Sequence, residues 1–387
     1  MMYRIYLYKF LIDFWVIVPV IVPFYRSHGM SATQILIIQA AYSLSQLVFE
    51  IPSGYFSDAI GRRKTLILAA FLMLSGIALY AWSEGFWWFV SAEVILGSAG
   101  AMRSGTDSAL LYDHLKSIRD EHRYKKCEGH AEFWSRTGTA VSAVAGGALG
   151  AFATLRLPFY VNMGSAFLML LVGFSLKEPF RAELPKGNPL RNILKTAWVS
   201  VRNPRLLSPM IRMGIIGSTG VTAIWGYFML YRHYNLPLVW HGIIFAAMQF
   251  TSAFGARHGA QFEGYLGYRI SSLMILVPGL LFVVIGLIHH AAVLLPLVML
   301  HALLWGMSTP LLLEEIQHRT TSDVRATTLS VSSMIGRIIT ICIGPAFGWI
   351  VDHRATGVAY ISMGCFFYTV IILAWFVTRS GMRSNRP

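Results

Sequence analysis

The chain has 387 residues, of which 55% are apolar and only 13% are charged, and its formal net charge is +14. A soluble globular domain carries about 25% charged residues, so this composition argues against a soluble enzyme and for a protein dissolved in a lipid bilayer. The basic residues lie in short segments between apolar runs, as expected for membrane topology and not for nucleic-acid binding. The three cysteines show no paired spacing and predict neither a disulfide framework nor a zinc site.

Several apolar runs are long enough to cross a bilayer, which takes about 20 helical residues. The clearest contain no Asp, Glu, Lys or Arg: Thr65–Ser83, Leu157–Leu176, Ile270–Ile288, Ala291–Leu313 and Ala355–Thr378. Membrane β-strands would instead alternate over segments of about 10 residues, and these runs do not alternate. In chain order we predict helices over 4–25, 31–56, 64–83, 86–112, 129–151, 155–177, 205–231, 238–257, 267–288, 291–315, 325–351 and 355–378.

The basic residues of the loops test this helix assignment. With the N-terminus inside, the inner segments carry 24 Lys and Arg and the outer loops carry four. Inner loops of membrane proteins are enriched in Lys and Arg. We therefore expect a multi-pass protein of the cell membrane with both termini in the cytoplasm.

The chain divides into two similar halves. We expect a six-helix bundle over 1–177, a polar, proline-containing cytoplasmic linker over 178–204, and a second six-helix bundle over 205–387. A weak repeat at an offset of roughly 200 residues supports the division, since Arg136 and Gly147 correspond to Arg337 and Gly348. A further faint echo of the turn after the second helix includes Gly267 and Arg269. Repeated halves that hold substrate near the midplane are common in transporters.

The turn after the second predicted helix contains the strongest motif. Gly54 is followed by three residues, Asp58, two residues, and then Gly61, Arg62 and Arg63. This pattern resembles the signature of the major facilitator superfamily, and the resemblance extends over the chain through helix count, central loop and half-repeat. It implies an all-α membrane protein with twelve transmembrane helices in two pseudo-symmetric six-helix bundles, of the drug-exporter-like permease type.

The resemblance also implies a gate. In the family a charge latch joins the second, fourth and eleventh helices at the cytoplasmic face, and here Asp58, Arg62 and Asp113 are its expected members. Gly54 and Gly61 allow close packing and a tight turn. Arg63 is better interpreted as a topology anchor.

Two positions depart from the family pattern. Glu93 stands where many members have an arginine linked to proton coupling, and Ser142-Ala143 stand where drug antiporters have Gly-Pro. Both departures count against an antiporter, although Gly344-Pro345 keeps the Gly-Pro pattern in the second half.

Charges inside predicted helices are costly in lipid, at about 2.5 kcal/mol or more each, so they point to a cavity or to mutual pairing. Our candidates for proton coupling are Asp13, Glu93 and Asp107, in that order. Candidates for the substrate cavity are Arg103, Glu132, Arg136, Arg212, Arg337, Trp15, Trp225 and Trp305. Arg103 with Asp107, and Glu132 with Arg136, are also spaced to pair along one helix. His301 is interpreted as a packing residue sooner than as a coupling group.

These observations favour a secondary transporter. The chain has no phosphate-binding glycine loop, nucleophile elbow or His-Glu-x-x-His motif, so we expect no enzyme activity, no cofactor and no metal. We predict a monomer that exports a small-molecule substrate in exchange for a coupling proton. Uptake of a small anionic or zwitterionic metabolite with protons is the alternative.

Overall fold

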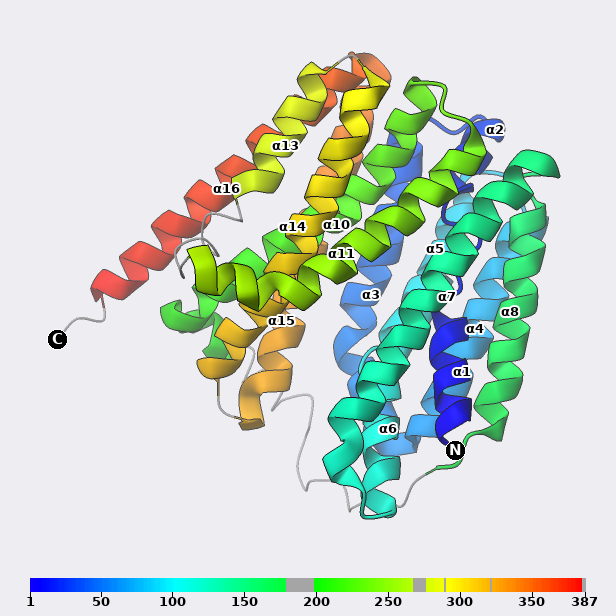
Figure 1. Ribbon diagram of the computed structural model, residues 1–387, viewed down its shortest axis with the longest axis vertical. Coiled ribbons are helices and arrows are strands. Elements are labelled where there is room, and N and C mark those ends of the chain that lie inside the picture. The colour runs from blue at the N-terminus through cyan, green and yellow to red at the C-terminus, as the bar shows by residue number, and fades with distance from the viewer. Residues whose placement is uncertain (179–197, 267–275, 289, 321, 385–387) are drawn as a thin grey trace. The chain divides into compact units, whose positions relative to one another are not determined.

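The regular structure is helical throughout the computed structural model, which describes residues 1–178, 198–266, 276–288, 290–320 and 322–384 (Figure 1). The elements are α1 (Met2–Ile12), α2 (Ile21–Ser27), α3 (Ala32–Ile60), α4 (Arg62–Trp82), α5 (Phe86–Arg103), α6 (Thr106–Ser117), the 3₁₀ helix η1 (Glu121–Arg123), α7 (Tyr124–Phe152), α8 (Leu157–Ser175), α10 (Pro204–His233), α11 (Leu238–Leu266), α13 (Leu276–Leu287), α14 (Ala291–His318), α15 (Ser322–His353) and α16 (Thr356–Ser384).

The helices follow the twelve predicted spans. Eight of those in the described ranges are individually long and apolar enough to cross a membrane: α3, α4, α8, α10, α11, α14, α15 and α16. The first span is divided between α1 and α2, the fourth between α5 and α6, and the ninth is described only from Leu276 as α13. The predicted linker falls largely within 179–197, and Gly267 and Arg269 belong to 267–275, so these lie outside the described residues.

The first span is not the continuous helix that we predicted over 4–25. α1 ends at Ile12, Asp13 caps it, and turns follow up to Val20. Backbone N–H and C=O groups that lack helical hydrogen bonds inside a membrane need other hydrogen-bond partners. The buried amide of Asn162 on α8 supplies them, accepting from the Ile17 amide at 3.4 Å and donating to the Phe14 carbonyl at 3.2 Å.

The fourth span is also interrupted, so the prediction of one helix over 86–112 is wrong. α5 ends at Arg103, and α6 begins at Thr106. Between them Gly105 adopts a φ of +72°, a left-handed conformation that glycine takes without steric cost. Because of this break, the residues after Gly105 face in a different direction from the one they would have on a continuous helix.

The residues group into two compact units. Unit 1 comprises Met1–Met30, Ala41–Leu190 and Asn235–Ala246, and unit 2 comprises Ser31–Ala40, Arg191–Tyr234 and Ala247–Pro387. The first turns of α3 thus belong to unit 2 and those of α11 to unit 1. The division of the chain at 178–204 stays a prediction.

Gly147 and Gly348, the glycines of the half-repeat, let the first turns of α11 and α3 pack closely in these units. In unit 1 a Cβ atom at Gly147 would lie 3.1 Å from the Cα of Gly242, at the start of α11. In unit 2 a Cβ atom at Gly348 would lie 2.8 Å from the Cα of Thr33, at the start of α3. Each glycine therefore permits a close helix crossing inside its own unit.

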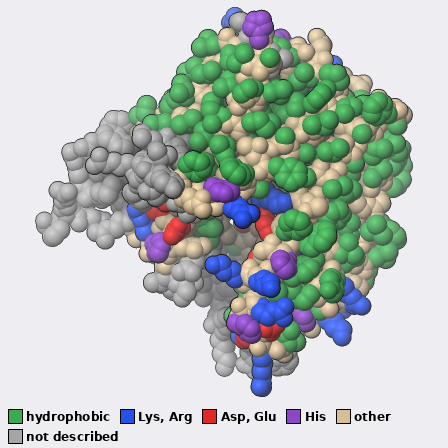
Figure 2. All heavy atoms as spheres, viewed as in Figure 1, with side chains coloured by type: hydrophobic (Ala, Val, Ile, Leu, Met, Phe, Trp, Pro, Cys, Tyr) green, Lys and Arg blue, Asp and Glu red, His purple; other side chains and the backbone are tan. Residues whose placement is uncertain are grey.

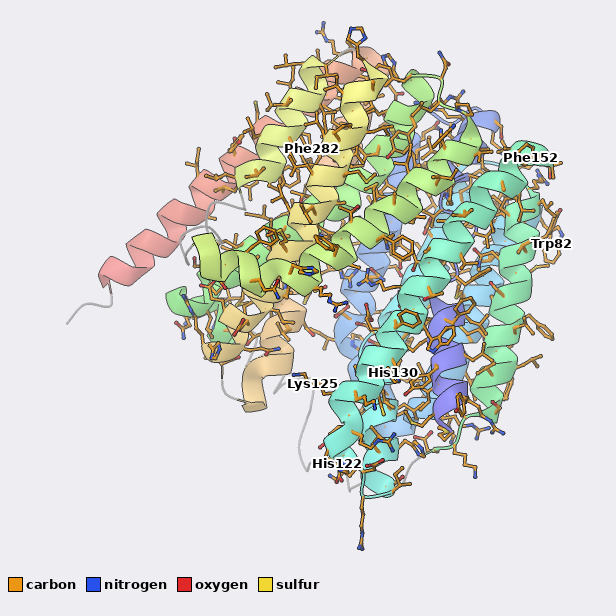
Figure 3. The ribbon with its side chains drawn as sticks, in the orientation of Figure 1. Trp82, His122, Lys125, His130, Phe152 and Phe282 are labelled. Atoms are coloured by element: carbon orange, nitrogen blue, oxygen red, sulfur yellow. The ribbon has the colours of Figure 1, made fainter. Side chains whose placement is uncertain are left out.

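Unit 1 is packed around α1 and α4. Helix α1 contacts α7 and α8, and helix α4 contacts α5 and α8. Its two ends differ in character (Figure 3). Trp82 and Phe152 lie at one end with exposed rings, whereas His122 and Lys125 lie at the opposite end. Aromatic residues at one boundary and basic residues at the other fit the predicted outer and cytoplasmic ends of a span.

Unit 2 is packed around α10, which contacts α14, α15 and α16, while α13 lies along α16. Its buried apolar residues include Leu206, Met210, Ile316 and Val331. Phe282 of α13, marked in Figure 3, stacks on Phe367 of α16 with ring centroids 5.8 Å apart.

Candidate functional site

The two helix breaks of unit 1 bring charged side chains together inside the protein. Asp13, at the end of α1, accepts a hydrogen bond from Arg103, at the end of α5, over 2.8 Å. Ser135 of α7 donates to the other carboxylate oxygen at 2.5 Å. Lys9 lies four residues before Asp13 on the same helix, but the fold pairs Asp13 with Arg103 from another helix.

A second ion pair lies one helical turn away on α1. The ammonium group of Lys9 is 2.7 Å from Asp107 on α6 and 3.6 Å from Glu128 on α7. Ser108 donates to Glu128 at 2.6 Å. Burial and the Glu128 carboxylate raise the pKa of Tyr124, just outside the span.

Sequence reasoning missed Lys9, which lies inside the first predicted helix but was not among the candidate site residues. Its side chain is only 8% exposed, so it is a buried charge. The pattern of Lys9 and Asp13, spaced four residues apart, was the available signal.

The expected pairing of Arg103 with Asp107 along one helix is wrong. Arg103 faces Asp13, and Asp107 faces Lys9, because the chain turns at Gly105. Four charges on α1, α5 and α6 thus form two opposite-sign pairs, and no pair lies within a single helix.

A small hollow adjoins Arg103 of the Asp13–Arg103 pair and has room for about one water molecule. Its lining includes Trp15, Tyr42 and Arg103, with apolar residues of α1, α4, α5 and α8.

Glu93 lies elsewhere in unit 1 and does not join this network. It is buried on α5, where Tyr80 donates to it at 2.8 Å and Tyr25 approaches at 3.4 Å. The two tyrosine hydroxyls are 2.5 Å apart. The predicted set of coupling carboxylates is therefore divided between two places.

The turn after α3 brings the motif residues together. Arg62 lies 2.8 Å from Asp58 and 3.3 Å from Asp113 on α6. Gly61 has a φ of +128° and permits the sharp turn. A Cβ atom at Gly54 would meet open space, so close packing does not explain that glycine.

The carboxylate of Glu178 accepts hydrogen bonds from the backbone amides of Arg62 and Arg63, both at 2.9 Å. The Arg63 side chain donates to the Phe174 carbonyl at 2.7 Å. Arg63 thus anchors the start of α4 to the end of α8, a contact that the motif alone did not reveal.

The remaining candidates are spread over both units. Glu132 and Arg136 pair with each other at 2.8 Å on α7, where both are about half exposed. Arg212 donates to both oxygens of Glu315 at 2.5 Å, and Glu315 also contacts Arg319 at 2.7 Å.

Three further candidates are Arg337, Trp225 and Trp305. Arg337 lies half-buried on α15, and Trp225 lies half-buried on α10. Trp305 lines a second cavity, within unit 2. Within the described ranges, no group of three or more His, Cys, Asp or Glu side chains is arranged to hold a metal ion.

In Figure 2 the Lys, Arg, Asp and Glu side chains gather on one part of the visible face, and hydrophobic side chains cover most of the rest. A largely apolar surface suits contact with lipid.

Comparisons with known proteins converge on one family. A model of the Major Facilitator Superfamily matches residues 10–345. The mouse vesicular acetylcholine transporter is 25% identical over 210 residues, which are 53% of this chain and 39% of that protein. The uridine/deoxyuridine transporter of Lactococcus lactis is 23% identical over 290 residues, 67% of this chain and 60% of that protein.

The fold agrees with solved structures. The nucleoside transporter NupG has a TM-score of 0.76 at 12% sequence identity, and the match covers 98% of each chain. The chain spans well under half the length of the vesicular acetylcholine transporters that it matches.

Proposed function

Because the chain belongs to the major facilitator superfamily, we propose that it is a secondary active transporter that exchanges a small solute for protons by alternating access. The observation that carries the proposal is the set of crossed ion pairs at the two helix breaks, Asp13 with Arg103 and Lys9 with Asp107. Interrupted helices are a common place for coupling sites in transporters.

We propose Asp13 as the proton carrier. In the paired state Arg103 and Ser135 favour the ionised carboxylate. A proton on Asp13 replaces Arg103 as the partner of the carboxylate, and Asp107 also acts electrostatically on Arg103. The guanidinium therefore has a second carboxylate nearby, which limits the cost of the exchange.

Glu93 is the second candidate carrier. Both tyrosine neighbours donate to its Oε1 atom, and hydroxyl donors stabilise a carboxylate without adding charge. Asp107 ranks third because Lys9 contacts it directly.

We propose that Asp58, Arg62 and Asp113 act as the gate. The three side chains link the turn after α3 to α6 in unit 1. Their partner on the eleventh helix stays a prediction from the family resemblance.

Efflux is the direction that we propose. The alternative, uptake of an anionic or zwitterionic metabolite, rested on buried arginines available to bind its negative group. Arg103 and Arg212 each contact a carboxylate in the structure, which weakens that argument. Known relatives include a transporter named for acetylcholine and one named for uridine, so the family does not favour anions.

We propose further that the protein acts as a monomer in the cell membrane with both termini in the cytoplasm. The loop-charge bias supports this orientation. A reporter fused to the C-terminus is expected to be active on the cytoplasmic side. Activity on the outer side would overturn the topology.

The test of transport uses two measurements. In cells, overexpression is expected to lower the content of one or more solutes relative to a deletion strain. In proteoliposomes, an imposed pH gradient is expected to drive that solute against its own gradient. A wild-type protein that ignores the pH gradient would refute proton coupling, and a rise in cellular content would refute efflux.

A further inference from the structure

The break in the first span releases two backbone groups from the helical hydrogen-bond pattern. In a continuous helix the Ile17 amide would donate to the carbonyl of Asp13, four residues earlier. The Phe14 carbonyl would accept from the Val18 amide in the same way. Instead, the Val18 amide donates to the Trp15 carbonyl at 3.3 Å. The Ile17 amide and the Phe14 carbonyl therefore need other hydrogen-bond partners inside the membrane.

One side chain of α8 replaces both missing bonds. Asn162 Oδ1 accepts from the Ile17 amide at 3.4 Å, and Asn162 Nδ2 donates to the Phe14 carbonyl at 3.2 Å. Asn162 Nδ2 also donates to the Ser165 hydroxyl at 3.2 Å, and Asn162 is fully buried. Because an amide offers both a donor and an acceptor without carrying charge, Asn162 satisfies both backbone groups and adds no charge to the span.

Helix α7 also fits the break. A Cβ atom at Gly146 would overlap the Val16 carbonyl, so glycine lets α7 lie against the backbone of the turn. Ser135, about three turns earlier on the same face of α7, donates to the Asp13 carboxylate at 2.5 Å. Helix α7 therefore contacts both the carboxylate and the turn that follows it.

Unit 2 lacks both the break and the amide. Its corresponding helix α10 contacts α16, as α1 contacts α8, and it continues from Pro204 to His233. The sequence of α16 contains no Asn, Asp, Gln or Glu. The break and the buried amide therefore occur together in unit 1, beside the carboxylate that we propose as the proton carrier.

We propose that Asn162 is a positioning residue of the coupling site, which holds the break in span one and thereby directs the Asp13 carboxylate toward Arg103. Its hydrogen bond goes to the backbone of Phe14, the residue that follows Asp13, so Asn162 acts on the carboxylate through the backbone. The inference rests on the proposed role of Asp13 as proton carrier.

The experiment is an acid titration of the intact, solute-free protein in lipid nanodiscs, followed by the infrared C=O band of protonated carboxyl groups. In each background, the difference from the same protein with Asp13→Asn isolates the band of Asp13. The charged groups that act most strongly on Asp13 are Arg103 and Lys9, and both stay in every variant. The midpoint of the Asp13 band therefore reports whether its contact with Arg103 is kept.

Asn162→Leu removes both hydrogen bonds and nearly keeps the side-chain volume. Ser45→Ala is the matched control, because buried Ser45 of α3 donates to the Val94 carbonyl of α5 at 2.7 Å. This control also removes a buried bond from a side chain to the backbone of another helix, but neither helix is α1. Ser165→Ala is a milder test, since it removes one acceptor of Asn162 Nδ2 and leaves the two bonds to span one in place.

We expect the Asp13 band of Asn162→Leu to appear at a pH about one unit or more higher than in the wild type. An opposite charge within about 4–6 Å changes the titration midpoint of a carboxyl group by about 1–3 units, and displacing Asp13 from Arg103 loses part of that effect. Ser165→Ala is expected to give a smaller shift in the same direction. Ser45→Ala is expected to lower the melting temperature without moving the midpoint, which is also what a purely structural Asn162 would do.

An unchanged Asp13 midpoint in Asn162→Leu would overturn the proposal, and so would an equal shift in Ser45→Ala. If Asn162→Leu does not fold, an unchanged midpoint in Ser165→Ala overturns it. Because the titration uses neither solute nor gradient, its outcome is independent of transport. A shifted midpoint in a protein whose transport ignores the pH gradient would refute proton coupling and leave Asn162 as the residue that places Asp13.

Discussion

The first and fourth spans of unit 1 correspond in the half-repeat to the seventh and tenth spans of unit 2. The two sets of spans differ in the buried ion pairs that they contain. Lys9 pairs with Asp107 in unit 1, and roughly 200 residues later Arg212 pairs with Glu315 in unit 2. The second pair of unit 1, Asp13 with Arg103, has no such counterpart.

At the corresponding places of unit 2 stand two buried apolar residues, Ile216 and Leu311. The helices differ too: spans one and four are broken, whereas α10 and α14 continue without a break through internal prolines. One ion pair is thus a feature of both halves, and it fits a structural role. The additional pair and the helix breaks belong to unit 1 alone, and we attribute coupling to them.

The largest expected effect is that of Asp13→Asn. The neutral side chain cannot balance Arg103 or carry a proton, so pH-driven accumulation should be lost while downhill exchange continues. Breaking a buried pair costs about 3–5 kcal/mol, and we expect somewhat less because both side chains are about 30% exposed. Flux assays and thermal melts of reconstituted protein measure the two effects.

Asp120→Asn is the control, since Asp120 pairs with Arg123 near the protein surface. The double variant Asp13→Asn with Arg103→Gln should recover stability without recovering accumulation. Recovery of both would make the pair structural only.

The corresponding change in unit 2 should separate stability from coupling. Glu315 is 8% exposed and contacts both Arg212 and Arg319, so Glu315→Gln should destabilise the protein by about 2–4 kcal/mol. The coupling ratio of protons to solute, measured in proteoliposomes, should stay at the wild-type value. A lower proton-to-solute ratio in Glu315→Gln, at normal stability, would contradict the assignment of coupling to unit 1.

The gate should affect rate more than stability. Asp58 is about half exposed, so Asp58→Asn should leave the melting temperature nearly unchanged. We expect transport to slow about tenfold, equivalent to a barrier increase of about 1.4 kcal/mol. Lys64→Gln, a change at an exposed neighbouring site, should transport normally, and equal rates in both variants would exclude a gating role for Asp58.

The smallest effect tests the break in span four. Gly105→Ala places a side chain at a φ of +72° and should cost about 1–2 kcal/mol. Gly129→Ala adds the same methyl group inside α7, where a Cβ atom meets open space, and should not destabilise. Equal melting temperatures in the two variants would show that the left-handed conformation is not required.

The lengths of the apolar runs and the loop charges were sufficient to predict the helices, because lipid forces long apolar segments and leaves charges in the loops. The motif from Gly54 to Arg63 was sufficient to suggest the family. They were not sufficient for the breaks. Pro209 and Pro310 lie inside continuous helices, whereas span one breaks beside Asp13 and span four at Gly105. Whether a helix breaks depends on distant partners such as Asn162, which no local pattern contains.

The same reason limits prediction of the site. Asp58, Arg62 and Asp113 were expected together, and the structure shows Arg62 in contact with both carboxylates. Arg103 was assigned the wrong partner because a continuous helix was assumed, and Lys9 was overlooked because it resembles a topology anchor. Partners across helices depend on tertiary packing, which a single sequence does not display.

The most direct test of the central claim compares proton movement in wild type and Asp13→Asn. Proteoliposomes loaded with a pH-sensitive dye receive the solute that the cellular comparison identifies, with no pH gradient imposed. The account predicts that solute movement drives an opposite proton movement in the wild type and in Asp120→Asn, and none in Asp13→Asn. Equal proton movement in Asp13→Asn would contradict it.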